Sequence, residues 1–372
     1  MYPASGLERK KPVNHTTRVI EGWTGPGKQD SVIEPLKPVD DGLHMQMGQR
    51  GMYEWWYFDA HFDNGYTLVV FFHASNPNPG LEGKTGMEIV LLRPDGVRVQ
   101  RSIPYKKADF YAARDRPEVR IGQNTLQVQQ RDGELPIYEI DVKEQGLGCH
   151  LTYQAEVNGW KPGTGLCHFC DLGFFGWVIP FARASVEGTI TDGEKTFRVQ
   201  GVGYHDHNWL NFRFATIIEY WMWGRIYSES FTVSYACIQC NDKVNCHTVK
   251  VLMLAEGKEV VLSTGEFDFL KDDFEYSPKA KHQFPKQVTI HVPGELKAKL
   301  KVKRILEAQD MLENYNPVLR FLAKYILRIQ PGYFRLLSRF DLDVMRDGIS
   351  VKETGEALHE IVLFKPVHSE AV

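Results

Sequence analysis

The stretch that decides the fold runs Tyr53-Glu54-Trp55-Trp56-Tyr57-Phe58, then Asp63-Asn64-Gly65, then Tyr66-Thr67-Leu68-Val69-Val70-Phe71-Phe72-His73. Aromatic and β-branched residues dominate the first and third segments, as is typical of strands. The short segment between them predicts a hairpin turn. The third segment is almost continuously apolar, so we expect its strand to be buried on both faces. Two antiparallel strands are therefore predicted where the β-rich body begins.

Short strands and turns recur along most of the chain. Pro94-Asp95-Gly96, Arg131-Asp132-Gly133 and Thr191-Asp192-Gly193 are further turn signals. Strands at this spacing predict an all-β protein of antiparallel barrels or sandwiches, not a parallel α/β sheet. Strands are expected near residues 87–92, 97–103, 124–130, 136–142, 148–157, 184–191, 196–202, 215–227, 230–240, 245–254, 258–264, 287–292 and 297–303.

Two segments depart from this pattern. Residues 1–50 are polar and broken by prolines, which predicts an extended arm that wraps the body. Residues 316–330 have an apolar stripe at helical spacing, with Pro317 in the first turn and three basic residues together on one side. This helix could cover a barrel end, or it could rest on a membrane and collect lipid. We expect residues 333–340 to continue this basic region.

Composition excludes several functional classes. The 372 residues suffice for two domains, and the net charge of -3 gives no basic field for a nucleic-acid partner. No secretory signal and no run of about 18 apolar residues is visible. The protein is therefore expected in the cytoplasm, with a peripheral position at the membrane as the alternative. Neither a GxGxxG segment after a strand nor a P-loop lysine motif occurs, which argues against a nucleotide cofactor.

The cysteines invite a zinc interpretation, because residues 167–170 and 237–240 both have CxxC spacing. The second pair lies in a strand-like run, where positions i and i+3 face opposite sides and cannot share a metal. The first pair lacks the usual knuckle residues. We therefore expect thiols rather than a metal site.

The segment Tyr204-His205-Asp206-His207-Asn208-Trp209 follows two glycines and concentrates polar chemistry. It places groups that titrate near neutrality beside a large π face. This combination suggests proton transfer to or from a mostly apolar molecule. The alternative is structural: some of these side chains form a hydrogen-bonded corner that ends a strand.

Two aromatic strings add candidate site residues. In a strand, Glu54 and Trp56 share one face, and Glu54 lies either in an apolar cavity wall or at the surface. In Trp221-Met222-Trp223 both indoles face one way. They either pack in a core or line a pocket, where their π faces attract positive charge.

Together, residues 54–60, 203–209 and 221–223 resemble the carotenoid 1,2-hydratase family and its lipocalin-like relatives, which include fungal Diels–Alderases. The resemblance runs from about residue 50 to the C-terminus. It implies two consecutive lipocalin-like β-domains with a site in or between them, and no metal or organic cofactor. We expect the arm and first domain in residues 1–202, and the second domain, with its helix near 316–330, in residues 203–372.

In the hydratases of this family, a histidine and a tryptophan two residues later belong to the acid/base site; these fall on His207 and Trp209. A tyrosine and an aspartate on a later strand complete the family's pattern. Tyr235 is a plausible match for the tyrosine, but Cys237 stands where the acid is expected. Either Asp206 or Glu54 supplies the acid, or the reaction differs.

The resulting hypothesis is a cofactor-independent hydratase that adds water to a C=C bond of an isoprenoid, either a carotenoid precursor or a prenyl lipid, through a tertiary carbocation. Asp206 would donate the proton together with His207, Tyr235 would position water, and Glu54 is a further candidate acid. The expected substrate-contacting residues are Trp56, His205, Trp209, Trp221 and Trp223. The alternatives are a cyclase or pericyclase acting on a polyene, and a non-catalytic lipid carrier. The sequence indicates no oligomeric state.

Overall fold

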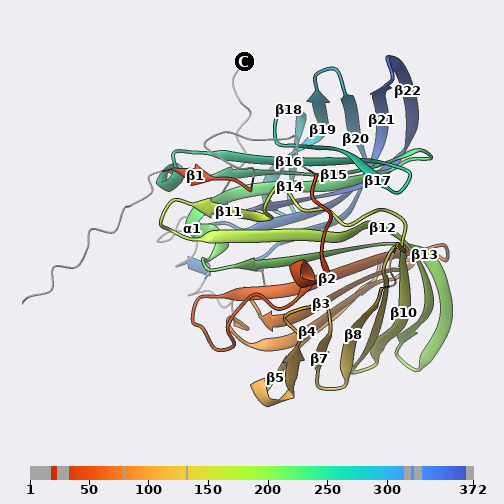
Figure 1. The fold of residues 1–372 in the computed structure, drawn as a ribbon. Helices are drawn as coiled ribbons and strands as arrows, with labels where there is room; N and C mark the ends of the chain where they lie inside the picture. The colour runs from red at the N-terminus through yellow and green to blue at the C-terminus, as the bar shows by residue number, and fades with distance from the viewer. Residues whose placement is uncertain are drawn as a thin grey trace, which may run out of the picture.

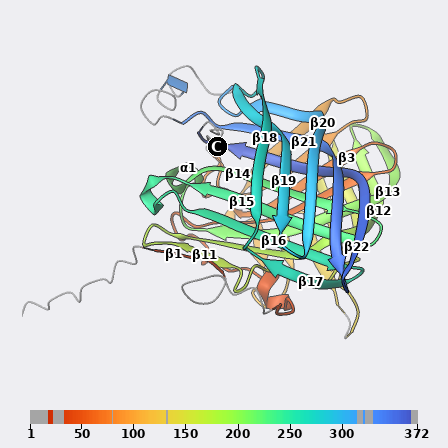
Figure 2. The same ribbon diagram turned by 90° about the horizontal axis from the view of Figure 1, so that it is seen from above.

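The computed structural model describes residues 18–22, 33–78, 80–130, 133–313, 320–321 and 329–365. Its architecture is almost entirely β, as predicted: a nearly closed lipocalin-like barrel lies beside a second curled sheet. Figures 1 and 2 show the second sheet stacked on one side of the first. All strand pairings within both sheets are antiparallel among the described residues.

The first sheet runs in the order β5-β4-β3-β2-β13-β12-β10-β9-β8-β7-β6, with β11 on β12 and β1 on β11. Its strands are β1 (Val19–Ile20), β2 (Tyr53–Phe62), β3 (Thr67–Ser75), β4 (Thr85–Leu92), β5 (Arg98–Tyr105), β6 (Phe110–Ala112), β7 (Val119–Ile121), β8 (Asn124–Gln129), β9 (Ile137–Glu144), β10 (Leu147–Ala155), β11 (Leu166–Phe169), β12 (Phe174–Asp192) and β13 (Lys195–Leu210).

The second sheet has the order β17-β16-β15-β14-β22-β21-β20-β19-β18. Its strands are β14 (Ile218–Tyr227), β15 (Phe231–Cys240), β16 (Thr248–Glu256), β17 (Glu259–Thr264), β18 (Asp268–Ser277), β19 (His282–Val292), β20 (Leu296–Asp310), β21 (Gly332–Arg346) and β22 (Ile349–Leu363). The short helical elements are α1 (Phe214–Ile217) and the 3-10 helices η1 (Pro38–Asp41), η2 (Lys107–Asp109) and η3 (Asp242–Val244).

The predicted hairpin is present as β2 and β3, and β3 is buried on both faces, as its apolar run predicts. One face of β3, with Val70 and Phe72, contributes to the core inside the barrel. Phe71, on the other face, packs against the cluster between the two sheets. A continuous apolar run therefore marks a strand that lies between two cores.

The change from the first sheet to the second occurs between Leu210 and Ile218. The expected border after residue 202 falls within β13, which continues to Leu210. The glycines and polar residues of this segment suggested a strand end, but β13 pairs with β2 throughout it. We propose that the two sheets are the two domains, with α1 and its flanking residues as the connection.

The segment that follows the predicted helix is a strand, and the helix itself lies mostly outside the described residues. Residues 333–340, expected to continue the basic region, belong to β21. The apolar side chains of Phe334 and Leu336 alternate with Arg335, which is the two-residue period of a strand. The helix expected over residues 316–330 falls largely outside the described part of the chain.

The described parts of residues 1–50 form an arm that contacts the first sheet. β1 pairs with β11, and the segment around η1 buries Asp41, Leu43 and Met45 against the barrel. None of the described helices has both the length and the apolar character needed to cross a bilayer. All six cysteines are present as thiols in the described structure.

The molecule has three apolar layers. The first fills the barrel and includes Trp56 and Phe58. The second lies between the sheets and includes Trp177 and Trp223. The third fills the curl of the second sheet. Each strand at the contact between the sheets therefore has one face toward its own core and one toward the other sheet.

Candidate active site

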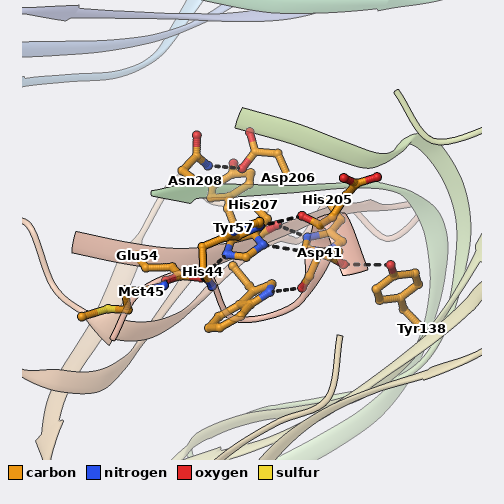
Figure 3. A network of polar contacts seen from close by, with 12 residues as sticks. Asp41, His44, Met45, Glu54, Tyr57, Tyr138, His205, Asp206, His207 and Asn208 are labelled. Atoms are coloured by element: carbon orange, nitrogen blue, oxygen red, sulfur yellow. Dashed lines mark hydrogen bonds and ion pairs between the residues drawn. The ribbon is translucent and has the colours of Figure 1, made fainter. Parts of the chain in front are cut away.

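The polar segment that follows Gly203 is part of β13, so its side chains alternate between the two faces of the strand. Figure 3 shows Asp206 and Asn208 on one side of the strand and His207 on the other, with Glu54 and Asp41. Asp206 and His207 are therefore not a catalytic couple, and that part of the sequence prediction is corrected.

The barrel-side group is centred on His207. Its Nε2 lies 3.0 Å from Glu54 Oε1, and its Nδ1 lies 3.1 Å from Asp41 Oδ1. All three side chains are almost completely buried. Burial by itself would lower the pKa of His207, but hydrogen bonds to Asp41 and Glu54 and the charges of both raise it to about 9. His207 is thus an imidazolium held between two carboxylates.

The same network fastens the arm to the barrel (Figure 3). Glu54 accepts hydrogen bonds of 2.7 Å from the backbone N–H groups of His44 and Met45. Asp41 Oδ2 accepts a hydrogen bond of 2.8 Å from the Tyr138 hydroxyl and lies 3.1 Å from His205 Nε2.

Two residues predicted to contact the substrate, Trp56 and Trp209, instead contact the arm. Trp56 Nε1 donates to the backbone oxygen of Asp41 at 2.9 Å. The Trp209 indole stacks on His44, with ring centres 3.7 Å apart. Glu54 lies in an apolar wall, one of the two predicted alternatives, but its oxygens are occupied by the arm. We therefore interpret this network as structural.

The opposite face of β13 presents Asp206 to the space between the sheets. Its Oδ2 accepts hydrogen bonds from the Tyr204 hydroxyl at 2.9 Å and from Trp177 Nε1 at 3.0 Å. Its Oδ1 accepts one from Asn208 Nδ2 at 2.7 Å. Burial raises the pKa of Asp206 to about 6 even though these three donors lower it. Such a carboxyl keeps its proton up to about pH 6. A general acid is most effective when its pKa lies close to the working pH.

Two indole rings lie on the facing sheet in the same layer as this acid. Trp221 and Trp223 both belong to the layer between the sheets, so they share a face, as predicted. The Trp223 ring centre lies 5.0 Å from that of Tyr204, whose hydroxyl binds Asp206. The structure therefore brings Asp206, Trp221 and Trp223 together in one layer, away from His205, His207, Trp209, Glu54 and Trp56.

A charged cluster lies in the same layer. Arg225 Nη2 donates to Asp59 Oδ1 at 2.6 Å, and the Arg225 guanidinium lies 4.9 Å from the centre of the Tyr204 ring. The Tyr57 hydroxyl donates to Asp59 Oδ2 at 2.9 Å. Arg335 Nη2 lies 3.5 Å from the same oxygen.

Several buried polar atoms in this layer have no hydrogen-bond partner among the described residues. They include Trp223 Nε1, Arg225 Nη1, Arg335 Nε and both ring nitrogens of His73. Buried polar groups are normally satisfied, so such a concentration requires an explanation. A bound molecule with polar groups between the sheets would supply these partners.

Two clefts reach the surface near these groups. One, of about 600 Å³, is lined by the arm residues Met45 and Met47–Gly51 and by Arg213. The other, of about 480 Å³, lies between the sheets and reaches Arg225, with His61 and Tyr227 also on its wall. Neither cleft is lined by Asp206, Trp221, Trp223, His207 or Glu54.

Tyr235, predicted to position water, lies elsewhere. It is 1% exposed inside the second sheet, and its hydroxyl lies 3.5 Å from His359 Nδ1. Gly224, opposite Tyr235, has no room for a side chain, because a Cβ there would fall 2.4 Å from the Tyr235 hydroxyl. Tyr235 therefore does not face Asp206.

Sequence reasoning missed Tyr204, Trp177, Arg225 and Asp59 on the site face and Asp41 in the anchor. For Tyr204 a signal was available, because positions 204, 206 and 208 share a face in any strand. The other four come from β12, β14, β2 and η1, and nothing in their local sequence indicates that these elements converge.

The comparisons with known proteins agree with this fold. The family model described as Diels-Alderase-like matches residues 170–305. The structure of a putative AttH from Nitrosomonas europaea is 15% identical with a TM-score of 0.59, covering 92% of this chain and 99% of that chain. Kievitone hydratase from Nectria haematococca is also 15% identical, with a TM-score of 0.55 and coverage of 94% and 98%. CghA with Sch210972 is 12% identical, with a TM-score of 0.58 and coverage of 88% and 96%.

At these identities the structural matches establish a shared fold. They and the family model support the broader part of the predicted resemblance, the lipocalin-like proteins that include Diels–Alderases and hydratases. No curated protein sequence matches the chain. Within the described ranges, no group of three or more His, Cys, Asp or Glu side chains is placed to hold a metal ion.

Proposed function

We propose that this protein is an enzyme that adds water to a C=C bond of an isoprenoid, with Asp206 as the proton donor in the layer between the sheets. The observation that carries the proposal is a buried carboxyl, with its pKa raised to about 6, in a layer lined by indoles. A fold shared with kievitone hydratase supports it, because that protein is named as a hydratase.

The reaction needs one carboxyl group. Asp206 transfers its proton to the less substituted alkene carbon, and the π electrons of the alkene form the new C–H bond. The other carbon becomes a tertiary cation. The oxygen of a water molecule bonds to that cation, and the proton that the water loses returns to the Asp206 carboxylate. Tyr204 and Asn208 hold the carboxyl in place throughout.

The indoles stabilise the cation without capturing it. The face of an aromatic ring attracts positive charge, and an indole is a poor nucleophile toward a cation. Trp223, near Tyr204, and Trp221, on the same face of β14, are the residues we assign to this role. A carotenoid precursor or a prenyl lipid would satisfy this chemistry, which uses no metal or organic cofactor.

A second candidate function is a pericyclase that folds a polyene in the same layer. The match of residues 170–305 to a Diels-Alderase-like family model favours it. There, Asp206 would donate a hydrogen bond to a substrate carbonyl and the indoles would shape the folded chain. Hydration incorporates solvent oxygen into the product, whereas cyclisation does not.

The test is turnover of a linear polyisoprenoid in heavy-oxygen water. We expect the wild-type product to carry the label, and Asp206→Asn to reduce the rate at least about 100-fold, the range for removal of a general acid. Ser350→Ala, which changes an exposed residue at the start of β22, is the matched control. Full activity of Asp206→Asn would reject the assignment, and unlabelled cyclic product would favour the pericyclase.

A further inference from the structure

The layer between the sheets contains two buried guanidinium groups whose hydrogen bonds are incomplete among the described residues. Arg225 is 2% exposed and Arg335 is 5% exposed. Both approach one carboxylate, Asp59, whose Oδ2 also accepts the Tyr57 hydroxyl. The Arg225 contact is short, at 2.6 Å, but the Arg335 contact is long, at 3.5 Å.

The second carboxylate nearby, Glu360, lies at a longer distance from its arginine than Asp59 does from Arg225. Its Oε1 lies 3.5 Å from Arg335 Nε, and neither atom has a hydrogen-bond partner in the described part of the structure. Burial raises the pKa of Glu360 despite the neighbouring Arg335 charge. Two guanidinium groups therefore face two carboxylates, of which only Asp59 is held by a short contact.

A buried N–H group without an acceptor is costly, so this arrangement calls for a further acceptor, which an anion would supply. The position of that anion is indicated by Arg225, which lines the cleft of about 480 Å³ and whose Nη1 has no partner among the described side chains. His61 lines the same cleft, and its Nε2 also lacks a partner there. The rest of the wall includes apolar side chains, among them Phe62, Leu306 and Leu358, together with the charged residues Arg93, Arg304 and Glu356.

We infer that this cleft binds a carboxylate, or a similarly acidic oxygen group, at one end of an otherwise apolar substrate, with Arg225 as its main partner. This inference rests on the proposed function and narrows its substrate class from neutral isoprenoids to isoprenoid or polyene acids. Tyr204 lies between the two centres, since its ring contacts Arg225 and its hydroxyl binds Asp206. An acid group at Arg225 would leave the rest of the substrate against the apolar part of the cleft wall.

The experiment compares all-trans-retinoic acid with its methyl ester, which has the same chain and no charge. Tryptophan fluorescence quenching gives both dissociation constants for the wild type. The test variant is Arg225→Gln combined with Asp59→Asn, because Arg225→Gln alone would leave Asp59 buried without its partner. Arg116→Gln, at an exposed ion pair with Glu118, is the control.

We expect the acid to bind at least about tenfold more tightly than the ester in the wild type and in Arg116→Gln. In the double variant the two ligands should bind within about twofold of each other. Equal affinity in the wild type, no binding of the acid, or a preference that persists in the double variant would overturn the inference. If the double variant does not fold, the wild-type comparison decides.

The binding readout requires no turnover, so it separates this inference from the proposed function. A lost acid preference together with labelled hydration of a neutral isoprenoid would reject the inference alone. If the wild type binds the acid more tightly than the ester but Asp206→Asn retains full hydration activity, only the proposed function is rejected.

Discussion

The pKa of Asp206 is higher than is usual for an aspartate because burial in the layer between the sheets opposes its ionisation. The donors Tyr204, Trp177 and Asn208 oppose that effect without cancelling it. A pKa of about 6 leaves a useful fraction of the proton-bearing form near neutrality while keeping the group acidic enough to protonate an alkene.

This pKa predicts the pH dependence of the reaction. The proton donor is the neutral carboxyl, so kcat/KM should be constant below about pH 6 and fall about tenfold per pH unit above it. The initial rate of labelled-water incorporation, measured across this range, checks the prediction. The residual rate of Asp206→Asn should not show this fall in rate above pH 6. Activity that rises through pH 6 would instead indicate an ionised Asp206 acting as a base.

At this scale the sequence identified the right residue types but not their grouping. The cluster after Gly203 contains both the candidate acid and the anchoring histidines. Because the strand was expected to end at residue 202, two-residue alternation was not applied to Asp206 and His207. The extent of β13 depends on its pairing with β2 and β12, which local sequence does not show.

At the scale of elements, the arm around η1 is fixed to the barrel by the His207 network. Asp41 comes from η1, whereas Glu54 and His207 come from β2 and β13. Their contacts join segments more than 150 positions apart in the sequence. The sequence indicated an arm, but it gave no sign that one of the arm's carboxylates completes a charged network inside the barrel.

The network predicts how stability depends on pH. The pKa of His207 is raised from 6.5 to about 9 on folding, so its contribution is fully present below about pH 6.5 and is lost as pH rises through about 9. The loss is on the order of 3 kcal/mol. Urea unfolding at several pH values in this window measures it.

His207→Gln is the comparison for this prediction, because glutamine keeps polar atoms but does not titrate. Its stability should be lower at neutral pH, and its difference from the wild type should shrink as pH rises. A difference between the two proteins that is independent of pH would show that His207 is not charged in the folded state.

At the scale of the whole molecule, the two sheets share one buried layer. Trp177 and Tyr204 of the first sheet pack in the same cluster as Trp223 and Ile238 of the second. The ion pair between Arg225 and Asp59 crosses this boundary at 2.6 Å. Separating the sheets would expose aromatic surface and buried charge together.

We therefore predict that both sheets unfold in one cooperative transition. Differential scanning calorimetry should give a single peak whose calorimetric and van't Hoff enthalpies agree. Tryptophan emission should change at the same temperature, since several indoles lie in the shared layer. Two resolved transitions would show that the sheets are independent and that the layer between them contributes little to stability.

The all-β class was predictable because turn signals and short apolar runs are local properties. The strands β18, β21 and β22 were not, because charged residues interrupt their apolar positions and their pairing partners lie far away in the sequence. The layer between the sheets was equally hidden, since it arises where residues from β2, β13, β14 and β22 meet.

The most direct test of the account is the titration of the Asp206 carboxyl by carbon-13 NMR, assigned by the resonance that disappears in Asp206→Asn. The account predicts a midpoint near 6 that moves when a polyene ligand is added, because the ligand contacts this face of β13. A midpoint at the ordinary value for aspartate of about 4, unchanged by any bound ligand, would contradict it.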